Sequence, residues 1–130
     1  MIMKREIKFR GKSTDTGKWV YGFLSFFYTA GRDENGLIFT DKARIYSPED
    51  GCCYDVWAET VGQFTGLRDK NKKEIFEDDI VAWYDLDGNY RKDIVKWMNG
   101  GLCLCNSLYT VGNYREIEVI GNIYDNPNLI

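Results

Sequence analysis

Carboxylate side chains gather in the second half of the chain. Glu77, Asp78 and Asp79 are consecutive, and Asp85 and Asp87 follow soon after. Carboxylates at this density can bind Mg²⁺ or Ca²⁺, or work as an acid and a base. Their spacing lacks the glycine and glutamate positions of an EF-hand loop. We therefore interpret them as turn carboxylates that accept hydrogen bonds from the backbone, and expect no metal site.

The four cysteines are the second group with possible chemistry. They form an adjacent pair, Cys52 and Cys53, and an alternate pair, Cys103 and Cys105. Neither pair has the two-residue separation of a zinc knuckle, so we expect small apolar side chains and no bound metal. The chain has no histidine, which excludes every mechanism that needs an imidazole base or ligand. We expect no catalytic residue and no cofactor.

The first 18 residues carry a local excess of positive charge. Six basic side chains stand against Glu6 and Asp15, a balance of 6 − 2 = +4, which leaves −3 − 4 = −7 for the rest of the chain. Alternating residues would form a basic stripe that could lie along a phosphate backbone. Its members are Lys4, Lys8, Arg10 and Lys12. The alternative is a solvated strand face whose charges discourage aggregation, which the acidic whole-chain balance favours.

Aromatic residues make up 15% of the chain and are dense in residues 19–27. If this segment is a regular strand, every second residue shares a face. Trp19, Tyr21, Phe23 and Phe27 would then lie on one face, with Phe26 and Tyr28 on the other. Aromatic surfaces are typical of subunit interfaces. Core packing is the default expectation for most of these aromatics, but a segment apolar on both faces in so short a chain also indicates self-association.

The elements that must position these residues are strands. Alternation predicts a strand over 3–12, and apolar runs predict strands over 19–27, 37–39, 43–46, 56–61, 80–84, 91–98, 102–108 and 116–123. Residues 29–36 are expected to form a loop that a hairpin fits, and 62–73 a connector between two halves. No long segment has a helical apolar stripe. We predict a mainly β protein, a sandwich or small barrel, with an N-terminal β region over 1–60 and a second half over 61–130.

Composition limits the class of protein further. The chain has 130 residues, is 44% hydrophobic and has a net charge of −3, which fits a small globular protein. No segment has the apolar length of a membrane span or signal peptide, so we expect a cytoplasmic protein with reduced cysteines.

Three stretches in order along the chain resemble the YopX family of phage and prophage proteins. They are residues 60–81, with Thr60-Val-Gly-Gln-Phe-Thr-Gly-Leu-Arg-Asp-Lys-Asn71; residues 5–22, with Arg5-Glu-Ile-Lys-Phe-Arg-Gly-Lys12; and residues 118–127, with Glu118-Val-Ile-Gly-Asn-Ile-Tyr124. Lys72 and Asp78 stand where the family usually has turn glycines, and Ala58 where it usually has proline. A non-glycine residue is costly at positive φ, so the turn types at Lys72 and Asp78 are left open.

The resemblance implies a mainly β fold with a C-terminal SH3-like barrel, carriage by a phage or integrated prophage, and no established activity. Our leading expectation is a non-enzymatic accessory protein that acts through protein contacts, including contacts with itself as a homo-oligomer. The alternative is a nucleic-acid-binding protein that uses the basic stripe. An enzyme is the third class, because no constellation of catalytic side chains is recognisable.

Overall fold

The structure is a computed structural model that describes residues 6–28, 31–98, 101–103 and 116–130. The fold is mainly β, as predicted, and the chain divides into two compact units, Met1–Gln63 and Phe64–Ile130. Among the described residues, no helix is long and apolar enough to cross a membrane.

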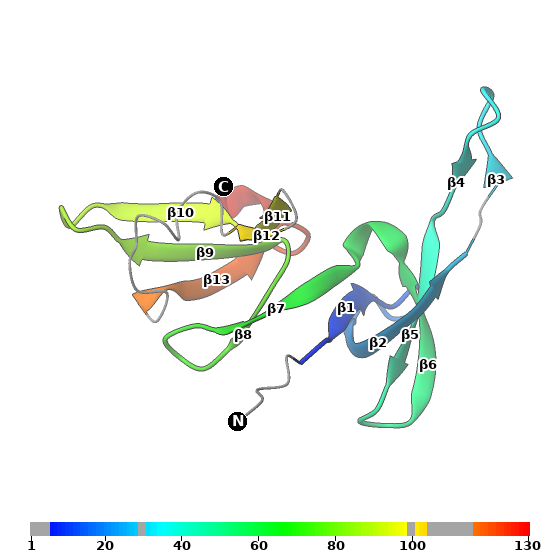
Figure 1. Cartoon of the computed structure of the whole chain (residues 1–130), viewed down its shortest axis with the longest axis horizontal. Helices are drawn as coiled ribbons and strands as arrows, with labels where there is room; N and C mark the ends of the chain where they lie inside the picture. Colours follow the sequence, from blue (N-terminus) through cyan, green and yellow to red (C-terminus); the bar gives the residue numbers. More distant parts are fainter. Residues whose placement is uncertain (1–5, 29–30, 99–100, 104–115) are drawn as a thin grey trace. The chain divides into compact units, whose positions relative to one another are not determined.

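The first unit is built on an antiparallel sheet in the order β6-β5-β2-β1 (Figure 1). Its elements are β1 (Phe9–Lys12), β2 (Trp19–Phe27), β3 (Gly31–Arg32), β4 (Ile38–Phe39), β5 (Lys42–Ser47), β6 (Cys52–Trp57) and the 3-10 helix η1 (Ala58–Thr60). β7 (Gly62–Arg68) begins in this unit, where Gly62 and Gln63 pair with β1. The prediction for 19–27 is confirmed, and so is the hairpin near 29–36, because β3 pairs with β4.

One face of this sheet carries the first core. Val20, Ala43, Ile45 and Val56 are buried there, with Phe9, Leu24, Tyr54 and Val61 packed against them. An isolated bridge between Ser13, the residue after β1, and Val56 of β6 brings these two strands close together. Gly11 permits this close approach, since a Cβ atom there would lie 2.7 Å from a methyl carbon of Val56.

The second unit holds the antiparallel sheet β10-β9-β13 and the β11-β12 hairpin (Figure 1). Its elements are the rest of β7, β8 (Glu74–Phe76), β9 (Asp79–Tyr84), β10 (Tyr90–Ile94), β11 (Lys96–Met98), β12 (Gly101–Cys103), β13 (Glu118–Asn122) and the 3-10 helix η3 (Pro127–Leu129). β9 is the central strand, and its residues 79–83 are all buried. The core contains Ile75, Val81, Trp83, Val95, Ile117 and Val119.

Four sequence predictions differ from the structure. The strand expected over 91–98 is two strands, β10 and β11, and of the strand expected over 102–108 residues 104–108 lie outside the described residues. Residues 56–61 are not extended throughout, because the 3-10 helix η1 follows β6. The expected connector 62–73 contains strand β7, which pairs with β8 on its second half. The strand expected over 3–12 begins at Phe9, and Ile7 before it is 58% exposed. In the second unit the described strands form no closed barrel.

Candidate interaction face

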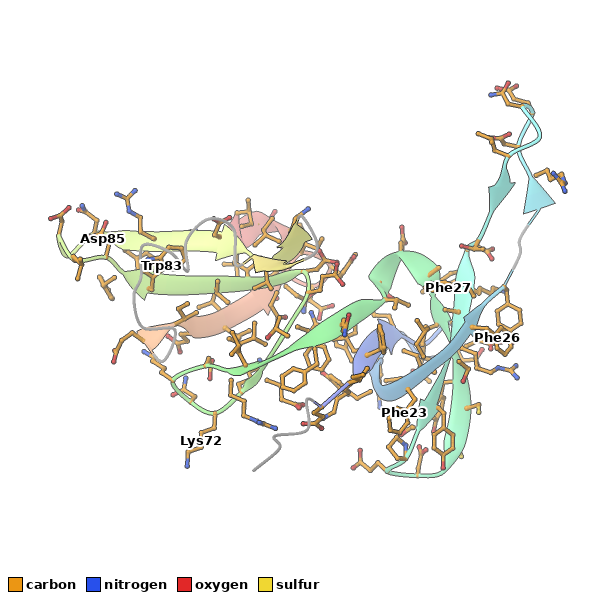
Figure 2. The ribbon with its side chains drawn as sticks, in the orientation of Figure 1. Phe23, Phe26, Phe27, Lys72, Trp83 and Asp85 are labelled. Atoms are coloured by element: carbon orange, nitrogen blue, oxygen red, sulfur yellow. The ribbon has the colours of Figure 1, made fainter. Side chains whose placement is uncertain are left out.

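A β-bulge in β2 decides which aromatic side chains share a face. Leu24 pairs with Ile45 of β5, and the next pair is Phe26 with Arg44, so Ser25 is the extra residue. Beyond the bulge the alternation is reversed. Phe26 therefore follows Tyr21 and Phe23 on the face opposite the core, while Phe27 pairs with the fully buried Ala43. Figure 2 shows Phe26 and Phe27 on opposite sides of β2.

The prediction that Phe27 shares a face with Trp19, Tyr21 and Phe23 is therefore wrong. Strict alternation would have been required from 19 to 27, and the bulge at Ser25 breaks it. Trp19 and Tyr21 pair with Lys12 and Arg10 of β1 and keep the expected orientation. Whether any of these side chains forms an interface stays a prediction.

Aromatic side chains from three neighbouring strands lie on this outer side of the first unit. We call this set the aromatic face: Tyr21, Phe23 and Phe26 of β2, Tyr46 of β5 and Trp57 of β6, all between 38% and 54% exposed. Phe23 and Tyr46 are a cross-strand pair whose rings are stacked with centroids 6.5 Å apart. A contiguous patch of exposed apolar side chains on a protein surface often marks an interaction site.

Cationic side chains lie over the rings of the aromatic face. The Arg44 guanidinium carbon is 5.6 Å from the centroid of Phe26, and Lys42 Nζ is 5.9 Å from that of Trp57. Both distances allow cation–π attraction, which is worth about 0.5–1 kcal/mol at exposed sites. The face is therefore both apolar and positively charged.

Asp55 of β6 fixes the position of Arg44. Arg44 Nε donates to Asp55 Oδ1 at 3.3 Å, and the Tyr28 hydroxyl donates to the same oxygen at 3.0 Å. Partial removal from water raises the pKa of Tyr28, and its hydrogen bond to the Asp55 carboxylate adds to the shift. Tyr28 packs edge-on against Phe26 at 5.0 Å, so these four side chains form one connected group.

The predicted basic stripe is not one exposed row. Lys4 lies outside the described residues, and Lys8 pairs with Glu6 at 3.3 Å before β1 begins. Arg10 is only 5% exposed, and its guanidinium lies 4.4 Å from the Trp19 ring centroid. Lys12 Nζ is 5.4 Å from the same centroid. A role for these residues in nucleic-acid binding remains a prediction.

The carboxylates of the second unit are engaged by the protein itself. Asp79 is buried and its Oδ2 accepts from the backbone N–H of Phe76 at 2.7 Å, while Asp78 Oδ2 accepts from the Tyr124 hydroxyl at 2.9 Å. The Asn89 backbone N–H, with the Arg91 guanidinium, lowers the pKa of Asp85 below its ordinary value. Within the described ranges, no three histidine, cysteine or acidic side chains gather as metal ligands would.

The cysteines are divided between the two units. Cys52 and Cys53 are free and exposed on β6, where neighbouring side chains point to opposite faces. Cys103 ends β12, and Cys105 lies outside the described residues. The expectation that the four thiols bind no zinc therefore stays a prediction.

Sequence reasoning missed Tyr46, Trp57, Lys42 and Arg44 as members of the face. The available signal was the turn-forming sequence Ser-Pro-Glu-Asp-Gly at 47–51, because a turn there pairs β5 with β6. That pairing brings Tyr46, Arg44 and Lys42 beside Cys53, Asp55 and Trp57. The position of β5 beside β2 is a longer-range contact that no local pattern specifies.

Comparison with known proteins gives a family and a related structure. The crystal structure of protein EF1440 from Enterococcus faecalis is similar, with 26% sequence identity, a TM-score of 0.51, and coverage of 97% of this chain and 99% of that chain. A search of curated proteins found no match. A family model described as YopX protein matches residues 8–130. Because that match spans nearly the whole sequence, the chain belongs to the YopX family, as its motifs predicted.

Proposed function

We propose that this protein is a non-enzymatic accessory protein of a phage or prophage, which works in the cytoplasm of its bacterial host through protein contacts, including contacts with itself. The observation that carries the proposal is the aromatic face, which has five exposed rings from three strands and a cationic side chain over two of them. Aromatic residues and arginine are the types enriched at protein interfaces.

Side chains at the aromatic face are held in fixed positions, which is typical of a binding surface. Arg44 is held by Asp55, and Tyr28 is held by the same carboxylate, so the charged group is already oriented before any partner arrives. Ordering side chains in advance reduces the entropy cost of association. Exposed rings on a rigid sheet lose few rotamers on binding.

The composition and the carboxylates support a protein without catalytic chemistry. The chain has no histidine, and Asp69, Asp78, Asp79 and Asp85 accept hydrogen bonds from backbone or tyrosine donors. We propose no cofactor. For the second unit we keep the SH3-like barrel as a proposal, supported by the antiparallel order β10-β9-β13 with β9 as its central, buried strand.

Sedimentation velocity of the whole chain over a range of concentrations tests the self-contact. A sedimentation coefficient that rises with concentration is expected. A monomer at every concentration up to roughly 1 mM, where even weak specific contacts are populated, would contradict self-association.

Nucleic-acid binding is the second candidate, favoured by the stacking of Arg10 and Lys12 over Trp19. Short single strands are the suitable probe, because exposed rings stack on unpaired bases. We expect no binding tighter than about 10 μM at physiological salt, because the whole chain is acidic. Sub-micromolar binding with a steep salt dependence, weakened by Lys12→Glu, would make this candidate the better one.

A further inference from the structure

A second group of exposed apolar side chains lies at the turn of the β9–β10 hairpin. Leu86 is 94% exposed, Tyr84 is 70% exposed and Tyr90 is 54% exposed. Tyr84 and Tyr90 are a cross-strand pair with ring centroids 5.3 Å apart. Asp87, which lies between them in sequence, is also exposed. We call these four side chains the hairpin tip: Tyr84, Leu86, Asp87 and Tyr90.

The hairpin tip is held in one conformation by its own turn. Asp85 Oδ1 accepts from the backbone N–H groups of Asp87 and Asn89, both at 2.9 Å, and Gly88 N–H donates to the Asp85 carbonyl at 3.0 Å. Arg91 Nε donates to Asp85 Oδ2 at 2.9 Å. The Asp85 carboxylate, labelled in Figure 2, therefore fixes the turn, and Asp87 supplies the acidic group next to Leu86.

The hairpin tip and the aromatic face have complementary chemistry. The face presents rings with Lys42 and Arg44 over them. Because Arg44 is already paired with Asp55, Lys42 is the cation that a partner's carboxylate would meet, and the rings offer contact to apolar groups. The hairpin tip has both kinds of group, with one leucine, two tyrosines and Asp87. Opposite charges set the register of such a contact, and the apolar atoms supply most of its free energy.

We propose that the hairpin tip of one copy docks on the aromatic face of a second copy, a contact that rests on the self-association proposed above. Leu86 packs among the rings of Phe26 and its neighbours, and Asp87 lies beside the Lys42 ammonium. Every copy carries both halves of the contact: two copies that exchange hairpin tips close into a dimer, and copies that do not exchange them continue into a ring or an open chain of subunits.

The contact is expected to be weak. Three apolar side chains bury less surface than the roughly 800 Å² per partner of a standard interface, so we expect a dissociation constant on the order of 100 μM for a single contact. A closed ring would be more stable, since its last contact forms within one assembly.

Two exposed leucines provide a matched pair of variants. Leu86→Asp places a charge in the hairpin tip, and Leu37→Asp makes the same change at a 66% exposed position beside another Asp-anchored turn. By sedimentation velocity, Leu86→Asp should weaken self-association at least tenfold, while Leu37→Asp should associate like the unchanged protein. Circular dichroism checks that both variants fold.

A mixing experiment then tests whether the hairpin tip of one copy docks on the aromatic face of another. Phe26→Ser disrupts the aromatic face and keeps the hairpin tip. Leu86→Asp disrupts the hairpin tip and keeps the aromatic face. Each alone should stay monomeric, and their mixture should form a 1:1 dimer that grows no further. If Leu86→Asp associates like the unchanged protein, the docking proposal is overturned although self-association stands.

If the proposed self-association itself is absent, sedimentation gives a different result. If the unchanged protein stays monomeric at every concentration, both self-association and this docking are overturned. If it is monomeric and also binds single-stranded DNA through Phe26, the docking is overturned in favour of a nucleic-acid partner for the face.

Discussion

At the residue scale, three hairpin turns share the same pattern of hydrogen bonds to an aspartate. In each, an aspartate accepts hydrogen bonds from the N–H groups two and four residues ahead, with Oδ1···N distances of 2.8–2.9 Å at Asp33, Asp69 and Asp85. The residue three positions after each aspartate has positive φ: Gly36 at 80°, Lys72 at 65° and Gly88 at 82°. A left-handed residue there is typical of a three-residue hairpin loop with a bulge.

Asp69 differs from the other two because it is also buried. Its Oδ2 accepts from the Val119 backbone N–H at 2.9 Å, which ties the turn to β13. We expect Asp69→Ala to lower the free energy of unfolding by about 2–4 kcal/mol, because three backbone donors lose a charged acceptor, one of them buried. Denaturant titration measures this loss. The control Asp85→Ala, at an exposed turn, should cost less, and equal losses would contradict the role of the Val119 bond.

Lys72 is the turn residue that departs from glycine. It stands on the exposed turn marked in Figure 2 with φ at 65°, a conformation costly for a residue with a Cβ atom. We expect Lys72→Gly to raise stability by about 0.5–1 kcal/mol, after the larger chain entropy of glycine in the unfolded state is subtracted. Thermal denaturation of the variant checks this, and the reverse change Gly88→Lys should destabilise. No gain for Lys72→Gly would mean that the lysine side chain compensates its own strain.

Asp78 is the second position where glycine was expected, and its φ is 72°. There the side chain offsets the strain, since Asp78 Oδ2 accepts the Tyr124 hydroxyl at 2.9 Å. The turn geometry is thus retained at both positions despite the loss of glycine, which the sequence alone had left open.

At the element scale, the β2–β5 pairing depends on a missing side chain. A Cβ atom at Gly22 would lie 1.9 Å from the carbonyl oxygen of Tyr46, a backbone atom that no side-chain rotation can move. We expect Gly22→Ala to destabilise the first unit by about 3–5 kcal/mol, because β5 must move away from β2. Denaturation followed by tryptophan fluorescence measures this. The nearby exposed Ser25→Ala should be close to neutral, and a mild Gly22→Ala effect would show that the hairpin can separate without unfolding.

Asp50 in the β5–β6 turn accepts a hydrogen bond from Tyr54 of β6 and changes the pKa of that tyrosine. The Tyr54 hydroxyl donates to Asp50 Oδ2, and this hydrogen bond raises the pKa of Tyr54 to about 12, while it lowers the pKa of Asp50. Neutral Tyr54 is the favoured form in the fold. Its contribution to stability is therefore complete below the unfolded pKa of about 10 and is lost as the pH rises through about 12.

Ultraviolet titration of phenolate, with Tyr54→Phe to identify the signal, should place Tyr54 among the last tyrosines to ionise. Asp50→Asn removes the charged acceptor and should return the pKa of Tyr54 toward 10. An unchanged titration in Asp50→Asn would contradict the assigned cause.

Strands that are marked by their own local sequence were predicted correctly, whereas features that depend on distant pairing were not. β2 and β9 were found from sequence because each is a run rich in apolar residues, with Gly17 before β2 and Asp87-Gly88 after β9 in turns. β7 was missed because Gly62 and Gly66 resemble a connector, although Phe64 and Thr65 between them are buried. The bulge at Ser25 leaves no local sequence signal, so the face of Phe26 and Phe27 required the pairing with β5.

At the scale of the whole molecule, the aromatic face joins side chains that are distant in sequence. β2 contributes three rings, while β5 and β6 contribute Tyr46, Trp57 and both cations. The basic stripe, read from local alternation, was not retained as one exposed row, because Arg10 is buried beside Trp19. At this scale the sequence alone predicted the family and the mainly β fold class.

The pair Phe26 and Phe27 provides the most direct test that the aromatic face is an interaction surface. Both side chains are 46% exposed on β2. The bulge places them on opposite sides of the strand (Figure 2), and only Phe26 lies on the face, with Arg44 over its ring. The measurement is sedimentation velocity of Phe26→Ser and Phe27→Ser across the concentration range in which the unchanged protein associates. We predict that Phe26→Ser stays monomeric while Phe27→Ser associates normally; equal behaviour of the two variants would contradict the account.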